Sequence, residues 1–138
     1  MLIIRPIEEK AQQETFALSC GVPYRVNDLA YAAYSDGNFI AISQFRVCDT
    51  HGILDDLALI PCSDDREALF ILGRQTLNWI DLLGIHFCRA RTNTADPRLL
   101  SLMGFIPSDT GDLIADMTHM FDGSCGGHCD LAQKLKEL

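Results

Sequence analysis

The feature that most constrains the fold is a pair of apolar, aromatic runs, residues 29–35 and 38–45, on either side of Asp36-Gly37. An Asp-Gly pair tolerates the positive φ angles of a tight turn, and such turns join antiparallel strands. A third apolar run, residues 53–60, follows the polar segment 49–52. The middle of the chain therefore predicts a three-stranded antiparallel meander.

The segments around this meander alternate between helical and strand patterns. From residue 64 to 83, apolar side chains recur at spacings of three and four and Gly84 follows, which predicts a long amphipathic helix. We expect the fold to be α/β (more narrowly α+β), with a mixed, mostly antiparallel central sheet and helices on both faces. We expect five aromatic residues to lie in the core because of their positions in the predicted strands and helices: Phe39, Phe45, Phe70, Trp79 and Phe87. The other expected elements are a strand at 2–4, a helix at 7–20, a strand at 86–90, a helix at 97–103 and a strand at 113–120.

Length and charge limit the classes of function. The chain has 138 residues, 48% of them hydrophobic and 22% charged, which is typical of one globular domain. We expect that domain to span residues 1–121, with a tail at 122–138 that ends in a short helix. The net charge of −8 opposes nucleic acid and anionic lipid, so neither is expected as a partner. The same charge favours an amine-bearing small molecule as partner. No apolar run is long enough to cross a bilayer, so we expect a cytoplasmic protein.

The tail places Cys125, His128 and Cys129 within five residues. Thiols and imidazoles are zinc ligands, but three of them do not close a tetrahedral structural site. A flexible tail with free thiols, a metal site and a redox pair all stay open, and no metal site is assigned.

Two segments carry a resemblance to a known family. The first is DDLALIP at 55–61, which leads into the long helix that ends with NWIDLLGI at 78–85. The second is TNTA at 92–95, followed by LLSLMGFIP at 99–107. In order and spacing, residues 2–120 resemble the GNAT acyltransferase family.

This resemblance implies a place for an acyl-CoA, most simply acetyl-CoA. In the family, the strand that corresponds to 53–60 diverges from the strand at 86–90, and the acyl-pantetheine arm lies in the notch between them. Backbone groups of Leu57, Ala58 and Leu59 would then bind the arm, with Arg66 and Asn93 as further cofactor-binding residues. The diphosphate would lie at the start of the long helix, where free N–H groups and the helix dipole attract an anion.

The start of the long helix departs from the family pattern. It contains no glycine between Pro61 and Gly73, and Asp64 and Glu67 have the spacing of a capping box that would occupy the N–H donors. Three carboxylates at 64, 65 and 67 also repel a diphosphate. An alternative is therefore a catalytically inactive relative that acts as a binding or self-associating domain.

The resemblance places an acidic base at Asp55 or Asp56. Because these residues are adjacent on a strand, we expect them to point to opposite faces, with Arg89 and Arg91 as partners. A structural ion-pair cluster of the four residues is the alternative. The family's tyrosine acid is replaced by Leu100, a loss that a thiolate leaving group tolerates. The leading hypothesis is an N-acyltransferase that transfers acetyl to an unknown amine, and the resemblance also allows for a homodimer.

Overall fold

A seven-stranded mixed sheet organises the chain. The computed structural model describes residues 1–122, and its strand order is β1-β2-β3-β4-β5-β7-β6. Every neighbouring pair is antiparallel except β4 and β5, which are parallel. The strands are β1 (Leu2–Pro6), β2 (Leu29–Ser35), β3 (Asn38–Val47), β4 (Gly52–Leu59), β5 (Phe87–Ala90), β6 (Phe105–Pro107) and β7 (Leu113–Asp116). The helices are α1 (Lys10–Ser19), α2 (Arg66–Leu82) and α3 (Pro97–Met103).

The hairpin of β2 and β3 confirms the prediction made from Asp36-Gly37. Asp36 has φ of 50° and Gly37 has φ of 86°, the positive values that a tight turn of this kind needs. Ser35 and Asn38 face each other at its base. The third strand of the predicted meander is β4, which pairs with β3 from Gly52 to Leu59.

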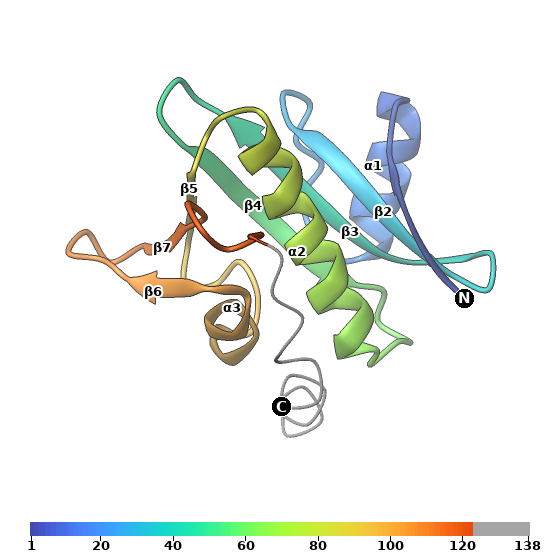
Figure 1. Cartoon of the computed structure of the whole chain (residues 1–138). Coiled ribbons are helices and arrows are strands. Elements are labelled where there is room, and N and C mark those ends of the chain that lie inside the picture. The colour runs from blue at the N-terminus through green and yellow to red at the C-terminus, as the bar shows by residue number, and fades with distance from the viewer. Residues whose placement is uncertain (123–138) are drawn as a thin grey trace.

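Helices cover both faces of the sheet, as predicted. Figure 1 shows α2 in front of the sheet and α1 behind it, against β2 and β3. The main core lies under α2, where Leu72, Leu77 and Ile80 are fully buried. Gly73 allows the close approach, because a Cβ there would lie 3.1 Å from Leu57 Cδ2 and 2.5 Å from Met103 Cε. The helix thereby rests directly on β4 and α3.

The sheet is thinly joined between β4 and β5. These strands pair only at Gly52 with Cys88, Ile53 with Arg89, and Leu54 with Ala90. Beyond Leu54, β4 continues to Leu59 without a neighbour on that side. The edge of β4 past the end of β5 is the place of the expected notch, and the divergence of the two strands stays a prediction.

Three expectations about the C-terminal half need correction. The strand predicted at 113–120 ends at Asp116, and β6 was not predicted at all, because its three residues follow α3 directly through Gly104. Phe87 was expected in the core but is 47% exposed, because the alternation of β5 turns Cys88 and Ala90 to the core and Phe87 to the other face. Phe45 and Phe70 are buried as predicted, and Trp79 packs edge-on against Phe45.

The described helices are all too short or too polar to cross a membrane. Cys125, His128, Cys129, the tail helix and nearly all of the segment 122–138 lie outside the described residues. The predicted division at residue 121 stays a prediction.

Candidate functional site

A β-bulge brings Asp55 and Asp56 to the same face of the sheet. Phe45 pairs with Leu54, but Gln44 pairs with Asp56, so β4 has one extra residue at this point. Asp56 shares the face of Gln44, and Asp55 reaches Arg46, two residues from Gln44 on the same face. The expectation that the two carboxylates point to opposite faces is wrong, because the bulge breaks the strand alternation.

Asp56 is held by two side chains. Arg25 Nε donates to its Oδ2 at 2.5 Å, and Gln44 Nε2 donates to the same oxygen at 2.9 Å. The Asp56 side chain is only 7% exposed. Asp56 is thus a buried, fully paired carboxylate.

Asp55 has different partners. Arg46 Nε donates to Asp55 Oδ2 at 3.0 Å and lies 3.9 Å from Asp28 Oδ1. The predicted partners Arg89 and Arg91 form no ion pair with either carboxylate. Arg91 instead donates from Nη2 to the backbone oxygen of Asp55 at 3.3 Å. The two arginines that sequence reasoning missed, Arg25 and Arg46, neutralise the acidic pair.

Asp28 and Asp55 form a carboxyl pair. Both carboxyls lie beside Arg46, and each shifts the pKa of the other. Asp28 Oδ2 is buried and receives no hydrogen bond from any donor among residues 1–122. Burial and the neighbouring Asp55 raise the pKa of Asp28 to about 7, whereas Asp28 and Arg46 outweigh burial and lower the pKa of Asp55. Asp28 can therefore exchange a proton near neutral pH.

The loop before β2 presents Asp28 and Arg25 to β4. Gln13 of α1 is 1% exposed and donates to the Arg25 carbonyl at 3.2 Å and to Gln44 Oε1 at 3.0 Å. Gln44 Nε2 donates to the Pro23 carbonyl at 2.8 Å. The one sequence signal for this network is the polar pair Gln44 and Arg46 on a strand that is otherwise apolar. Nothing in the sequence around Asp28 marks it.

A cavity of about 240 Å³ lies beside Asp55 on the face of the sheet opposite α2. Asp55 lines it, whereas Asp56 does not. The other lining residues are Arg46, His51, Ile53, Arg89, Ala90, Arg91 and Asp112. Of the two predicted catalytic residues, only Asp55 is therefore placed to meet a small ligand here.

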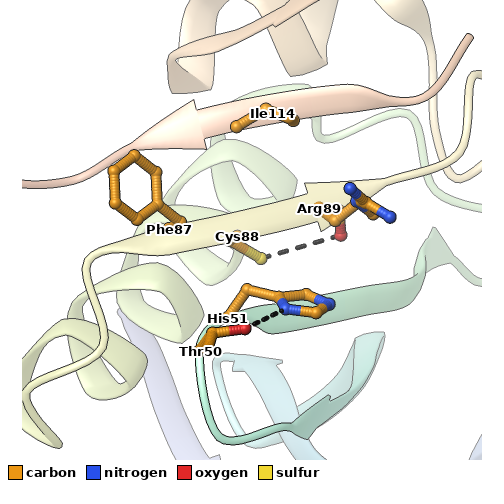
Figure 2. Close-up of a pocket in the computed structure, with 6 residues that line it drawn as sticks. All are labelled: Thr50, His51, Phe87, Cys88, Arg89 and Ile114. Carbon is orange, nitrogen blue, oxygen red and sulfur yellow. Dashed lines mark hydrogen bonds between the residues drawn. The ribbon is translucent and has the colours of Figure 1, made fainter. Parts of the chain in front are cut away.

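A second cavity of about 210 Å³ adjoins the first through two shared residues, His51 and Arg89. Figure 2 shows His51, from the turn before β4, facing Cys88 and Arg89 of β5. Cys88 is 1% exposed, and burial raises the pKa of its thiol to about 12. The thiol stays protonated, so Cys88 is a packing residue and not a nucleophile. No cluster of three metal-ligand side chains occurs within residues 1–122.

The notch between β4 and β5 exposes backbone groups. The N–H of Ile60 points to β3, where it bonds to the Ile40 carbonyl at 2.8 Å. Because N–H directions alternate along a strand, Leu57 and Leu59 direct their backbone groups to the other side, into the notch. No strand pairs with them there. An extended ligand with amide groups can supply the missing hydrogen bonds.

Most backbone N–H groups at the start of α2 are already hydrogen-bonded within the protein. The cap is Asp65, which accepts from Ala68 N at 3.0 Å, so the capping box predicted from Asp64 and Glu67 is wrong by one residue. Arg66 N donates to the Asp64 carbonyl at 2.8 Å. The N–H of Glu67 has no partner among residues 1–122. Arg66 is exposed, with its charge near Asp96, whose pKa is lowered by the Arg98 N–H and, to a smaller extent, by Arg66.

The turn after β5 closes one end of the notch. Thr94 Oγ1 donates to the Leu54 carbonyl at 3.4 Å, which fixes this turn against β4. Asn93 is exposed in the same turn. Leu100 is fully buried, so the position predicted for an acid carries a core side chain.

Neither protein-family models nor curated proteins match this sequence. Solved structures do. The PaiA N-acetyltransferase of Thermoplasma acidophilum, in complex with coenzyme A, has 17% identity and a TM-score of 0.65 over 83% of this chain and 96% of its own. A GNAT family acetyltransferase of Elizabethkingia anophelis with acetyl-CoA bound has 12% identity and a TM-score of 0.64 over 83% of this chain and 97% of its own.

The chain has the GNAT fold. The ribosomal-protein-S18-alanine N-acetyltransferase of Escherichia coli gives a similar match, with 14% identity and a TM-score of 0.67 over 85% of this chain and 94% of its own. These identities are too low to carry residue roles, so the resemblance is confirmed at the level of the GNAT fold.

Proposed function

We propose that the protein is an acyl-CoA-dependent N-acyltransferase that transfers an acetyl group from acetyl-CoA to a small amine. The observation that carries this proposal is the position of the Asp28–Asp55 carboxyl pair, which adjoins both the unpaired edge of β4 and the cavity beside Asp55. Donor, acceptor and proton-accepting group can therefore meet at one point. The GNAT neighbours solved with coenzyme A or acetyl-CoA support the choice of donor.

The donor would lie along β4. Its pantetheine amides would bond to the backbone of Leu57 and Leu59, with Ala58 between them, as a strand would. The diphosphate would then reach the start of α2, where Arg66 and the free N–H of Glu67 are the groups that attract it. Asn93, at the far side of the notch, is the remaining predicted contact. This arrangement directs the thioester toward the bulge at Asp55.

Transfer requires the amine nitrogen to bond to the thioester carbon while the carbon–sulfur bond breaks. The amine must lose a proton, and Asp28, beside Asp55, has a raised pKa of about 7, so that its ionised form can take up a proton near neutral pH. Asp55 lines the cavity and so would take the proton from the amine and pass it to ionised Asp28, because the pKa of Asp55 is lowered and that of Asp28 is raised. The sulfur leaves as a thiolate, which needs little help from an acid because its pKa is only modestly above neutral.

The start of α2 favours the rival function, a GNAT-fold domain that binds without catalysis. Asp64, Asp65 and Glu67 surround the place where a diphosphate would lie, and the N–H groups of Arg66 and Ala68 are already bonded. A bound anion there would have to displace water from a locally acidic surface. Under this function, the Asp28–Asp55 pair is only part of a structural polar network.

Thermal or urea unfolding with acetyl-CoA separates the two functions. A ligand at 100 times its Kd stabilises the native state by about 2.7 kcal/mol. We expect acetyl-CoA to do so, and desulfo-coenzyme A, which lacks the thioester, to do so more weakly. Release of free thiol with an amine acceptor then tests turnover. An unchanged unfolding curve at millimolar acetyl-CoA would leave only the non-catalytic function.

A further inference from the structure

The cavity beside Asp55 is rich in cations, although the protein as a whole has a net charge of −8. Arg46, Arg89 and Arg91 line it together with His51, against the carboxylates of Asp55 and Asp112. Three of the few arginines in the chain are thus gathered around a small hollow in the sheet face. Such a gathering against the overall charge needs a specific explanation.

The three arginines differ in what they bind. Arg46 is paired with Asp55 and Asp28, and Arg91 donates to the Asp55 carbonyl. The guanidinium of Arg89 makes no hydrogen bond or ion pair with any group in residues 1–122. It is half-buried on β5, between Ile53 of β4 and Ile114 of β7, which are its direct neighbours in register. A partly desolvated cation between two apolar residues is a ready partner for an anion.

His51 can contribute a second donor at the same place. Its Nδ1 lies 3.0 Å from Thr50 Oγ1 (Figure 2). If the hydroxyl donates to Nδ1, the proton of the neutral ring resides on Nε2, which can then donate to a ligand. Both cavities are lined by His51 and by Arg89, so one ligand can contact both donors.

The donor's diphosphate is a poor candidate for this anion. It would belong at the start of α2, which follows the C-terminal end of β4, whereas Arg89 is paired with Ile53 near the N-terminal end. Six strand residues separate Ile53 from Leu59, or about 20 Å. The anionic group at Arg89 therefore has to come from the other substrate.

The geometry points to an acceptor that carries a carboxylate as well as its amine, an amino acid or a closely related amino carboxylate. This inference rests on the proposed acyl transfer. The amine would lie beside Asp55 and the carboxylate beside Arg89 and His51, which are separated by about two strand residues, or roughly 6–7 Å. A cavity of about 240 Å³ suits a molecule of this size, because larger ligands occupy roughly 300–1,000 Å³. The net charge alone favours a cation, and the local arginines refine that expectation to a zwitterion.

Binding can be tested without any acyl donor. Each proteinogenic amino acid and its carboxamide, which lacks the carboxylate charge, would be titrated against the protein by ligand-observed NMR. We expect one or a few amino acids to bind and their carboxamides to bind at least tenfold more weakly. Arg89→Met should weaken amino-acid binding tenfold or more, because a charge-assisted hydrogen-bond pair is lost. Arg5→Met is the matched control, since Arg5 is exposed on β1 at the far edge of the sheet.

The outcomes separate this inference from the proposed function. If amino acids and carboxamides bind equally, or if Arg89→Met matches Arg5→Met, the carboxylate site is wrong even when acetyl-CoA binds. If Arg89→Met weakens acetyl-CoA binding alone, the anion is a phosphate of the donor and the inference is again wrong. Amino-acid binding that depends on Arg89 without acetyl-CoA binding would keep the site and remove the acyltransferase. If Arg89→Met does not fold, Arg89→Lys, which keeps the charge but loses the planar fork, should weaken binding several-fold.

Discussion

Asp28 and Asp55 share one guanidinium, since Arg46 Nε lies 3.0 Å from Asp55 Oδ2 and 3.9 Å from Asp28 Oδ1. One residue comes from the loop before β2 and the other from the bulge of β4. Burial and the neighbouring carboxyl of Asp55 raise the pKa of Asp28 to about 7. This makes the pair sensitive to pH in both stability and reactivity.

Asp28→Asn should change how stability depends on pH. The native pKa of Asp28 is about 7, above its ordinary value near 3.8, so between these values the native chain keeps a proton that the unfolded chain releases. The free energy of unfolding of the wild type should therefore fall as pH rises from 5 to 8, by about 2 kcal/mol from this group. Asparagine can still donate to Asp55 and does not titrate, so this part of the fall should disappear. Urea unfolding at both pH values measures it.

The control for that experiment is Asp109→Asn, a change at an exposed residue. It should keep the wild-type slope. Parallel curves for wild type and Asp28→Asn would show that the carboxyl pair does not hold a proton.

Asp55→Asn should mainly lower kcat, whereas Asp56→Asn should mainly lower the free energy of unfolding. Removal of the cavity-facing carboxylate should lower kcat by about a hundredfold and leave the KM for acetyl-CoA almost unchanged. Asp56 does not line the cavity, but asparagine there removes the negative charge that pairs with Arg25, which should cost about 1–3 kcal/mol of stability. Steady-state kinetics and urea unfolding on both variants test the split. Equal losses of kcat would mean that the cavity does not define the reactive carboxylate.

Asp64→Asn and Glu67→Gln should each tighten the binding of acetyl-CoA. Neither side chain caps α2, because that role belongs to Asp65. Each change removes one negative charge near the expected diphosphate, worth about 1 kcal/mol at low salt, or roughly three- to fivefold in Kd. Calorimetric titration at low and high salt measures the effect, which should shrink as salt rises. Glu14→Gln on α1 is the charge-matched control, and a similar gain there would contradict this account of the helix start.

Gly104→Ala should destabilise the fold more than Gly84→Ala. Both glycines have left-handed φ values, 115° and 87°, so alanine is strained at either position by about 1 kcal/mol. Only at Gly104 would the new Cβ also meet a side chain, 2.4 Å from Met120 Cε, whereas nothing lies within 4 Å at Gly84. We expect a loss of about 2 kcal/mol at residue 104 and about 1 kcal/mol at residue 84 in urea unfolding. Equal losses would mean that Met120 moves aside at no cost.

The fold was predictable from the sequence where local signals are strong. The Asp36-Gly37 turn and the spacing of apolar residues in α2 are local signals, since each can be recognised within one short segment of sequence. Strand β6 was missed because three residues after a helix give no periodicity. The exposure of Phe87 was missed because it depends on which face of β5 is turned to the core.

The candidate site was predictable only in part. Asp55 and the edge of β4 follow from the order of elements and from the resemblance. The partners of the carboxylates do not, because Arg25 and Asp28 are brought to β4 by hydrogen bonds of Gln13 and Gln44 between distant segments. The bulge at Asp55 is a shift in the pairing of β3 with β4, so the sequence of either strand alone does not predict it.

Strands β4 and β5 share three residue pairs, and α2 contacts strands on both sides of this junction. A molecule bound along the unpaired edge of β4 would add backbone hydrogen bonds there and would connect strands β1–β4 with strands β5–β7–β6. Slowed amide hydrogen exchange would then spread beyond the contacted backbone, to strands on both sides of the junction. Ligand capture and rigidity of the whole sheet would thus be one event.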